Sequence, residues 1–471
     1  MRKLQIKKLV PLLPPLVVTF IVYISMSIVL IKNLYVWFDE SFTAYLVRGN
    51  FAGIIHYTTI DVHPPLYYFL LKIWSLIFGS SLPALRAHSV VFGALSIVLL
   101  YKLLQNLGSG KCKAFKTTLV LILVAASPLF LLYATQVRMY SMNIFLSILS
   151  ILLAVRIEQD EKITNRHWTQ YTLVVVAMMY THYYLALIIL AEIIWLVIVK
   201  RREVLCRKLL IAVVGAVVAY APWIPTLLKQ IDSLKNGSWQ PKSTLTVLGQ
   251  FLNEMFFFYN SEISNYEKAP VLHGLIAFAL LLGVVTFALK FARTRLTYLL
   301  LLVVVVPPIF CYIVNMFIAR YLLSSVVCLP LLAGIVLLSE GNFLKFIPAV
   351  FLMCVLPLGY PKLFTVGTNS APAVIKQVLD DVRPEEVVLA EDYVIYMDFA
   401  AYESASFKVY LDAKNGKNED KDHGWPSLEM LEDNNGEFKV RDPEEFVKTH
   451  EKVLVVDADK MRHLVNGEPV K

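Results

Sequence analysis

The sequence has few charged residues. Only 17% of its 471 residues are Asp, Glu, Lys or Arg, whereas a soluble globular protein carries about 25%. The deficit comes from long apolar runs, and 57% of the residues are hydrophobic. This composition excludes an ordinary soluble chain and predicts a polytopic membrane protein.

Several common sequence motifs are missing as well. None of the five cysteines has CxxC spacing, so neither a zinc knuckle nor a disulfide framework is indicated. The run Gly108-Ser109-Gly110-Lys111 is followed by Cys112, which does not fit a Walker phosphate loop. The sequence also shows no internal repeat, which disfavours transporter folds built from inverted repeats.

The charges that are present divide the chain in two. Residues 369–471 hold 23 acidic and 13 basic residues, whereas residues 1–368 hold 13 acidic and 31 basic residues. We therefore expect a basic membrane domain over 1–368 and an acidic soluble domain over 369–471. The basic excess lies mostly in short loops, where it orients a membrane protein, so it does not indicate a nucleic-acid partner.

The apolar runs predict about eleven transmembrane helices. We place them near 9–31, 86–106, 117–134, 140–157, 168–181, 183–200, 208–228, 270–290, 297–318, 321–339 and 343–362. With a cytoplasmic N-terminus, every strongly basic short loop falls on the cytoplasmic side, as the positive-inside rule requires. The opposite, outer side then receives a first loop over 32–85 and the acidic domain.

The two extracytoplasmic regions have their own predicted structure. In the first outer loop we expect two juxtamembrane helices, near 40–50 and 64–78; the second is too short to span. In the acidic domain, apolar spacing predicts a helix over 373–382 and buried strands at 387–390 and 453–456, with a charged loop over 412–437. This domain is expected to be a small α/β unit.

An acidic pair follows the first span. Asp39 and Glu40 lie beside an apolar helix, where charge is costly, so they are candidate catalytic residues. A carboxylate can take the proton of an acceptor hydroxyl or amine. The alternative is that the pair only favours the start of the next helix, because acids stabilise helix N-termini.

A second motif in the same loop runs from Asp61 to Tyr68. Asp61, His63 and Tyr67 are candidate substrate-binding residues, because the tyrosine offers a hydroxyl and a stacking face. The alternative is a rigid proline turn with an aromatic interface anchor. Asp61 and His63 could also help to bind a divalent metal, since carboxylate and imidazole are common ligands. No third ligand accompanies them, so we assign no metal site.

Further polar residues lie at the predicted outer ends of spans. Arg138 and Arg320 can hold a phosphate bidentately, although either could be an interfacial arginine that only extends to the membrane surface. Further substrate-binding candidates are the aromatic neighbours Tyr140 and Tyr321, and a turn histidine with its own neighbour, His182 and Tyr183. For His182 the alternative is a solvated or backbone-bonded turn residue.

Together these motifs resemble a known family. The Asp39-Glu40 pair, the HPPLYY run, Gln-x-Arg-x-Tyr at 136–140, the sequence from His182 and Arg320-Tyr321 are similar to the dolichyl-phosphate-mannose protein mannosyltransferase superfamily, including bacterial aminoarabinose transferases. The resemblance covers roughly 9–340. It implies a GT-C glycosyltransferase fold.

The resemblance also implies a reaction. Such enzymes pass a sugar, with inversion, from a polyprenyl-phosphate donor to a lipid, glycan or protein acceptor on the outer face, without a required cofactor. Asp39 would match the base, and Arg138 and Arg320 the arginines that hold the carrier phosphate. The loop 229–269 is too short for the lumenal domain of eukaryotic protein mannosyltransferases, and His63-Pro64 replaces the Lys-Pro of the aminoarabinose enzymes. Neither a protein acceptor nor lipid A is therefore favoured.

Two other functions remain open from the sequence. A transporter or flippase of lipid-linked glycans would need a charged residue within a span, and Glu192 is the clearest candidate. A scaffold that displays the acidic domain would need neither the acidic pair nor the arginines. The chain is expected in the cell membrane, in contact with membrane lipids.

Overall fold

A computed structural model defines the fold over most of the chain. Its description covers residues 13–105, 112–159, 164–199, 203–235, 271–339, 343–365, 386–391, 393–402, 408–412, 439–456, 461–465 and 468–469, with a few isolated positions.

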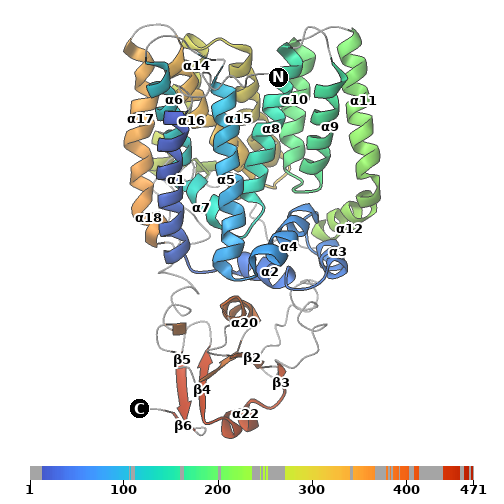
Figure 1. Ribbon diagram of the computed structural model, residues 1–471, viewed down its shortest axis with the longest axis vertical. Coiled ribbons are helices and arrows are strands. Elements are labelled where there is room, and N and C mark those ends of the chain that lie inside the picture. Colours follow the sequence, from blue (N-terminus) through green and yellow to red (C-terminus); the bar gives the residue numbers. More distant parts are fainter. Residues whose placement is uncertain are drawn as a thin grey trace, which may run out of the picture. The chain divides into compact units, whose positions relative to one another are not determined.

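The membrane region is a bundle of helices (Figure 1). These are α1 (Leu13–Asn33), α5 (Leu82–Leu104), α6 (Lys113–Ala125), α7 (Pro128–Thr135), α8 (Tyr140–Gln159), α9 (Asn165–Met179), α10 (Leu185–Val199), α11 (Glu203–Tyr220), α12 (Ile224–Lys235), α14 (Val271–Phe291), α15 (Arg295–Ile313), α16 (Leu323–Leu338), α17 (Ile347–Val355) and α18 (Tyr360–Thr365). Short 3₁₀ helices include η3 (Ala221–Trp223) before α12 and η4 (Ala319–Leu322) before α16.

The predicted count of eleven spans is not confirmed. Over the described ranges, six helices are long and apolar enough to cross a membrane, or seven if α6 and α7 together form one bent span. These two helices meet at 60°, because Pro128 opens α7 and cannot continue the hydrogen bonding of α6. Other predicted spans, such as α10, are apolar but only 15 residues long.

Two glycines set close helix packing in this bundle. A Cβ at Gly334 of α16 would lie 2.3 Å from a methyl carbon of Val120 in α6. A Cβ at Gly93 of α5 would lie 2.0 Å from the Tyr23 hydroxyl of α1. Small residues let membrane helices approach closely, so α16 packs directly on α6. The apolar part of α16 is 94% buried.

The chain divides into two compact units. The first contains the described parts of 1–32, 89–261 and 266–363 and holds most of the bundle. The second joins 33–88 to the described residues from 364 onward. The predicted domain boundary at residue 368 stays a prediction.

In the second unit, the connection between α1 and α5 contains three helices rather than two. These are α2 (Phe38–Leu46), α3 (Phe51–Ile60) and α4 (Leu66–Phe78). The predicted helix over 64–78 is confirmed as α4. The one near 40–50 is corrected: α2 ends before Gly49, and α3 then begins with the Asn50 side chain accepting from the Gly53 N–H.

The remainder of the second unit contains a six-stranded sheet. Its strands are β1 (Val387–Ala390), β2 (Lys408–Asp412), β3 (Lys439–Val440), β4 (Lys452–Val456), β5 (Met461–Val465) and β6 (Glu468–Pro469), in the order β3-β2-β1-β4-β5-β6. The first four are parallel, and the last two are antiparallel additions.

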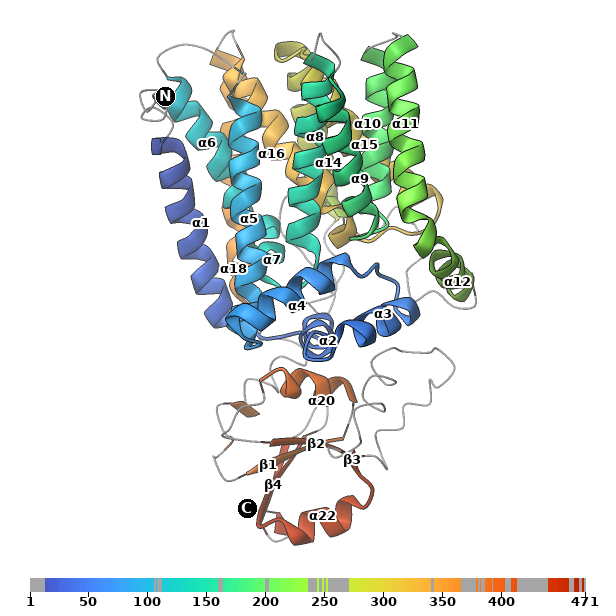
Figure 2. The same cartoon turned by 45° about the vertical axis from the view of Figure 1, so that its right-hand side comes forward.

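Helices cover the two faces of this sheet (Figure 2). They are α20 (Tyr393–Ala400) and α22 (Pro443–Thr449), which lie on opposite sides of the strands. Leu389, Val453 and Val455 form the buried core on the α22 side. The predicted strands at 387–390 and 453–456 are confirmed, whereas the predicted helix over 373–382 and loop over 412–437 fall almost wholly outside the described residues.

Candidate functional site

Helix α2 carries the acidic pair in its first turn. Trp37 is the extended residue that precedes the helix, and Asp39 and Glu40 follow it directly. The partial positive charge of a helix N-terminus favours carboxylates at this position. Asp39 is partly exposed, whereas Glu40 is fully buried. Two adjacent acids therefore have different surroundings.

Glu40 is held by Arg86 of α5. The Arg86 Nε donates to Glu40 Oε1 at 3.1 Å, and Nη2 donates to Oε2 at 2.9 Å. The same guanidinium donates to the carbonyl oxygens of Leu34, at 2.7 Å, and Tyr35, at 3.2 Å. This bidentate pair is buried on both sides, so it fixes α2 against the start of α5.

The acidic domain contacts the same helix. Ser41 of α2 donates a short hydrogen bond to Asp398 of α20. Close by, the Val36 N–H donates to the Tyr402 hydroxyl at 2.6 Å. Burial raises the pKa of Tyr402, and nearby Arg86 opposes that shift. The acidic pair is therefore positioned partly by residues more than 350 positions later in the chain, which local sequence patterns did not reveal.

The Asp61–Tyr68 motif forms the turn between α3 and α4 and the first residues of α4. His63 Nδ1 lies 3.0 Å from Asp61 Oδ2. Tyr67 is fully buried, with its ring 5.7 Å from that of His88. Among the described residues no group of three or more His, Cys, Asp and Glu side chains could hold a metal ion. The pair Asp61–His63 supplies two ligand types, and the expectation that no metal is required stays a prediction.

In the first unit, Arg138 lies in the tight turn between α7 and α8. Its backbone N–H donates to the Gln136 carbonyl at 2.8 Å, and the Ser89 hydroxyl donates to the same carbonyl at 2.6 Å. The Arg138 side chain is 2% exposed. The alternative considered from the sequence was an arginine that only extends to the membrane surface. Such a side chain would be exposed, which does not fit this burial.

Three of the predicted residues gather around the ring of a fourth, Tyr321. Tyr321 lies 4.7 Å from the His182 ring and 6.5 Å from the Tyr140 ring, measured between ring centroids. The Arg320 guanidinium carbon lies 5.3 Å from the Tyr321 centroid, a distance suited to a cation–π contact. We call Tyr140, His182, Arg320 and Tyr321 the aromatic–arginine cluster. Tyr140, His182 and Arg320 are buried, and Tyr321 is half-buried.

Tyr183 points elsewhere. Its hydroxyl donates a short hydrogen bond to Gln230 of α12 and accepts one from Trp223 Nε1 at 3.0 Å. It therefore fixes the start of α12 and is not part of the aromatic–arginine cluster. The next residue, Tyr184, packs against this cluster instead, with its ring 4.8 Å from that of Tyr321.

Sequence reasoning assigned no role to three polar groups near Arg138 in the chain. Gln136 Oε1, Ser141 Oγ and Asn143 Oδ1 are buried and have no hydrogen-bond partner among the residues that the structure describes. A buried polar atom without a partner costs about 1–3 kcal/mol, so such a group at one turn is typical of a site that binds a polar ligand. The available signal was the presence of two amide residues and a serine close to Arg138 in the sequence.

Glu192, the acid that favoured a transporter, is fully buried in α10. It accepts hydrogen bonds from the Ser150 hydroxyl at 2.7 Å and the Tyr171 hydroxyl at 2.8 Å. These partners come from α8 and α9, so Glu192 links three helices of the bundle. Its hydrogen bonds account for its burial without a transported ion.

The chain is similar to a known family over part of its sequence and to known structures in its fold. The family model of dolichyl-phosphate-mannose-protein mannosyltransferase matches residues 62–228. The solved structure of ArnT from Cupriavidus metallidurans in the apo state is 12% identical, with a TM-score of 0.52, and the similarity covers 93% of this chain and 92% of that one. The same enzyme bound to undecaprenyl phosphate is 13% identical, with a TM-score of 0.51 and the same coverage.

A third relative is an oligosaccharyltransferase. AglB from Archaeoglobus fulgidus, solved with an inhibitory peptide and a dolichol-phosphate, is 12% identical; the similarity covers 96% of this chain and 70% of that one, with a TM-score of 0.50. No curated protein matches the chain significantly. The chain is therefore a membrane protein with the fold of these GT-C glycosyltransferases. Its predicted resemblance to the protein mannosyltransferases is confirmed over residues 62–228.

Proposed function

We propose that this protein is a glycosyltransferase that moves a sugar from a polyprenyl-phosphate donor to an acceptor on the outer face of the membrane. The observation that best supports this proposal is the pair of buried guanidiniums, Arg138 and Arg320. Arg138 is near Gln136, Ser141 and Asn143 in the chain, and Arg320 belongs to the aromatic–arginine cluster. The fold is shared with ArnT, whose structure contains undecaprenyl phosphate.

Arg138 and Arg320 bind the donor phosphate in this proposal. The bond between the anomeric carbon and the phosphate oxygen breaks, and the phosphate leaves with the bonding electrons. Its negative charge is stabilised by fixed cations rather than by a proton, and a buried guanidinium is effective because little water screens it. Ser141 and the Asn143 amide add hydrogen bonds to the donor. Bound metal is not required for this step, although one remains compatible with it.

Asp39 acts as the base. The acceptor oxygen or nitrogen attacks the anomeric carbon from the side opposite the phosphate, so the sugar centre inverts, and the acceptor proton passes to the Asp39 carboxylate. Glu40 has both oxygens engaged by Arg86. We therefore assign it a positioning role and assign proton transfer to its partly exposed neighbour.

The remaining residues bind substrate. Tyr140, Tyr321 and His182 offer ring faces and polar edges to the sugar, while Asp61, His63 and Tyr67 serve the acceptor side. The mechanism requires the Asp39 carboxylate to reach the acceptor atom that attacks the anomeric carbon. The N-terminus is cytoplasmic and the acidic domain extracytoplasmic in this arrangement.

The test is donor turnover by the purified protein. Protein in vesicles is mixed with a radiolabelled polyprenyl-phosphate sugar and membrane extract as acceptor source, and release of free polyprenyl phosphate is measured. Asp39→Asn is expected to lower the rate at least about 100-fold, the usual contribution of a positioned base. Glu444→Gln is the matched control, because Glu444 also lies in the first turn of a helix.

Two results would contradict the proposal. Full turnover by Asp39→Asn would show that this carboxylate is not the base. Transfer of intact lipid-linked glycan across the vesicle membrane, without release of carrier phosphate, would instead support the flippase.

A further inference from the structure

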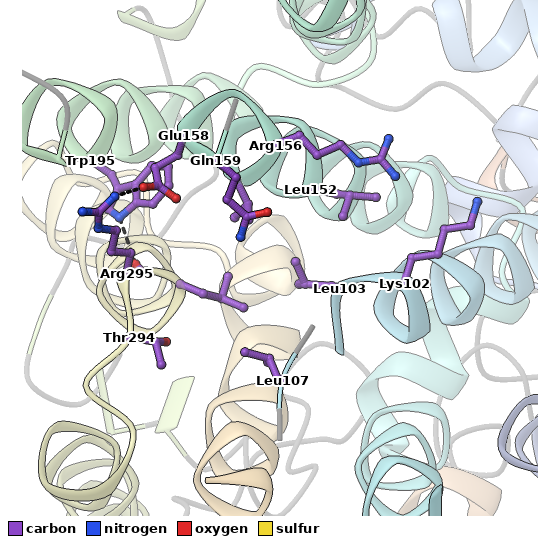
Figure 3. A pocket seen from close by; sticks show the side chains of 12 residues that line it. Lys102, Leu103, Leu107, Leu152, Arg156, Glu158, Gln159, Trp195, Thr294 and Arg295 are labelled. Carbon is purple, nitrogen blue, oxygen red and sulfur yellow. Dashed lines mark hydrogen bonds and ion pairs between the residues drawn. The ribbon is translucent and has the colours of Figure 1, made fainter. Parts of the chain in front are cut away.

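The bundle has a cavity at the end opposite the aromatic–arginine cluster. Its volume is about 280 Å³. It is formed by the C-terminal ends of α5 and α8, by α10 and by the start of α15 (Figure 3). Tyr140 begins α8 near the cluster and Gln159 ends it at the cavity. Twenty helical residues span about 30 Å, which is the thickness of the hydrocarbon core. The cavity therefore lies near the other membrane surface.

One side of the cavity carries a satisfied ion pair. Arg295 of α15 pairs closely with Glu158 of α8, whose side chain is 7% exposed. Trp195 of α10 donates from Nε1 to the Arg295 carbonyl at 2.9 Å. These contacts hold three helices together on this side of the cavity. The charge of Glu158 is already balanced by Arg295.

The other side carries two exposed cations. Lys102 lies in the last turn of α5 and Arg156 in the last turn of α8, and Figure 3 shows both side chains on the side away from the Glu158–Arg295 pair. Neither has an ion pair with any residue in the described ranges. The rest of the cavity wall is both polar and apolar, because the Gln159 amide and the Thr294 hydroxyl line it together with several leucines.

We propose that this cavity binds the headgroup of an anionic glycerophospholipid from the inner leaflet. Lys102 and Arg156 contact the phosphate, Gln159 and Thr294 add hydrogen bonds, and the acyl chains follow the apolar wall from Leu103 and Leu107. Basic cavities between membrane helices on the cytoplasmic side suit such headgroups. The sequence places its basic short loops at this end, as the positive-inside rule requires of a cytoplasmic surface. This site is separate from the proposed donor site and does not depend on it.

A lipid source fits better than free phosphate because the polar groups form only part of the wall. Five leucine and valine side chains also face the cavity: Leu103, Leu107, Leu152, Val155 and Leu296. Inorganic phosphate would leave this apolar surface wet, whereas an acyl chain covers it.

The experiment titrates the full-length protein in non-ionic detergent with short-chain lipids. Binding of dioctanoyl-phosphatidylglycerol is followed by native mass spectrometry and by the shift in melting temperature. Each basic residue near an anionic headgroup contributes about 1 kcal/mol, so the double variant Lys102→Gln/Arg156→Gln is expected to bind about 30-fold more weakly. Each single variant is expected to lose about fivefold.

The matched control is Arg293→Gln. Arg293 is an exposed cation in the α14–α15 connection, next to Thr294 in the chain. Its Nε donates to the Leu289 carbonyl at 2.7 Å, and it does not line the cavity. It should bind the lipid like the unmodified protein.

Three outcomes would overturn the proposal. The double variant could bind dioctanoyl-phosphatidylglycerol as tightly as the unmodified protein does, or the unmodified protein could bind dioctanoyl-phosphatidylcholine equally well. Inorganic phosphate could also compete with the same affinity, which would identify the ligand as free phosphate. The single variants separate loss of binding from loss of folding, because exposed helix-end substitutions are usually within about 0.5 kcal/mol.

Discussion

Glu40 in α2 and Glu192 in α10 are both fully buried, but their partners differ. Glu40 meets the Arg86 guanidinium at both oxygens, whereas Glu192 meets two hydroxyls, from Ser150 and Tyr171. A buried ion pair must balance a large desolvation cost, and losing one partner exposes that cost. Hydroxyl partners fix a carboxyl group without opposing its charge. The first region therefore depends on charge balance, and the second only on hydrogen-bond geometry.

The largest expected effect is at the ion pair. Glu40→Gln leaves Arg86 buried without its counter-charge, which should lower the free energy of unfolding by about 3–5 kcal/mol. Thermal or denaturant unfolding of the purified protein measures this. Glu391→Gln is the control, because its partner Arg462 is 59% exposed, and an exposed pair contributes about 0–1 kcal/mol. Equal losses in the two variants would contradict the assigned charge balance.

The arginines of the two regions should fail differently. Arg86→Gln should destabilise the fold, whereas Arg138→Ala should mainly weaken donor use. Hydrogen bonds to a charged group contribute about 1.5–3 kcal/mol, so the donor KM should rise roughly 10- to 100-fold. Initial rates at varied donor concentration measure this, with Arg293→Ala as the control. An unchanged donor KM would remove Arg138 from the phosphate site.

A smaller effect is expected at Glu192. Glu192→Gln keeps an acceptor for one hydroxyl and should cost less than about 1 kcal/mol of unfolding free energy. Glu192→Leu leaves both hydroxyls buried without that acceptor and should cost about 1–3 kcal/mol. Both variants should retain donor turnover. If Glu192→Gln abolished activity while remaining folded, a transporter-like role for this acid would gain support.

The smallest effect should follow metal removal. Because arginines supply the positive charge in the proposed step, treatment with EDTA should change donor turnover by less than about twofold. Rates before and after dialysis against EDTA, with Mg²⁺ or Mn²⁺ restored as the control, test this. A loss of turnover that either ion reverses would contradict this and would make Asp61 and His63 candidate metal ligands, since His63 Nδ1 lies 3.0 Å from Asp61 Oδ2.

Much of the fold was accessible from apolar patterns. Long runs predicted α1, α5 and α8, and the proline-started run at 64–78 predicted α4. The count of spans was less accessible, because hydropathy does not register where an apolar helix ends or breaks, as at α10, which is 15 residues long, and at Pro128. The α2–α3 division was also missed, since it depends on a local cap at Asn50 rather than on apolar spacing.

The candidate site was accessible only in part. Local motifs indicated His182, Arg320 and Tyr321, which meet in the bundle. The pairing of Glu40 with Arg86 joins residues 46 apart, and the bond from Ser41 to Asp398 joins residues 357 apart. Such contacts are set by tertiary packing, and one sequence carries no periodic signal for them. Residue roles in the proposed reaction stay predictions until the variants are measured.

The close packing at Gly334 bears on how variants of this gene would be interpreted. An added methyl group would occupy the space of the Val120 side chain, so an alanine allele there should force α16 and α6 apart. An allele that lowers activity in this way would be scored in a genetic screen alongside true catalytic positions. Protein abundance in the membrane, measured beside activity, distinguishes the two classes of allele.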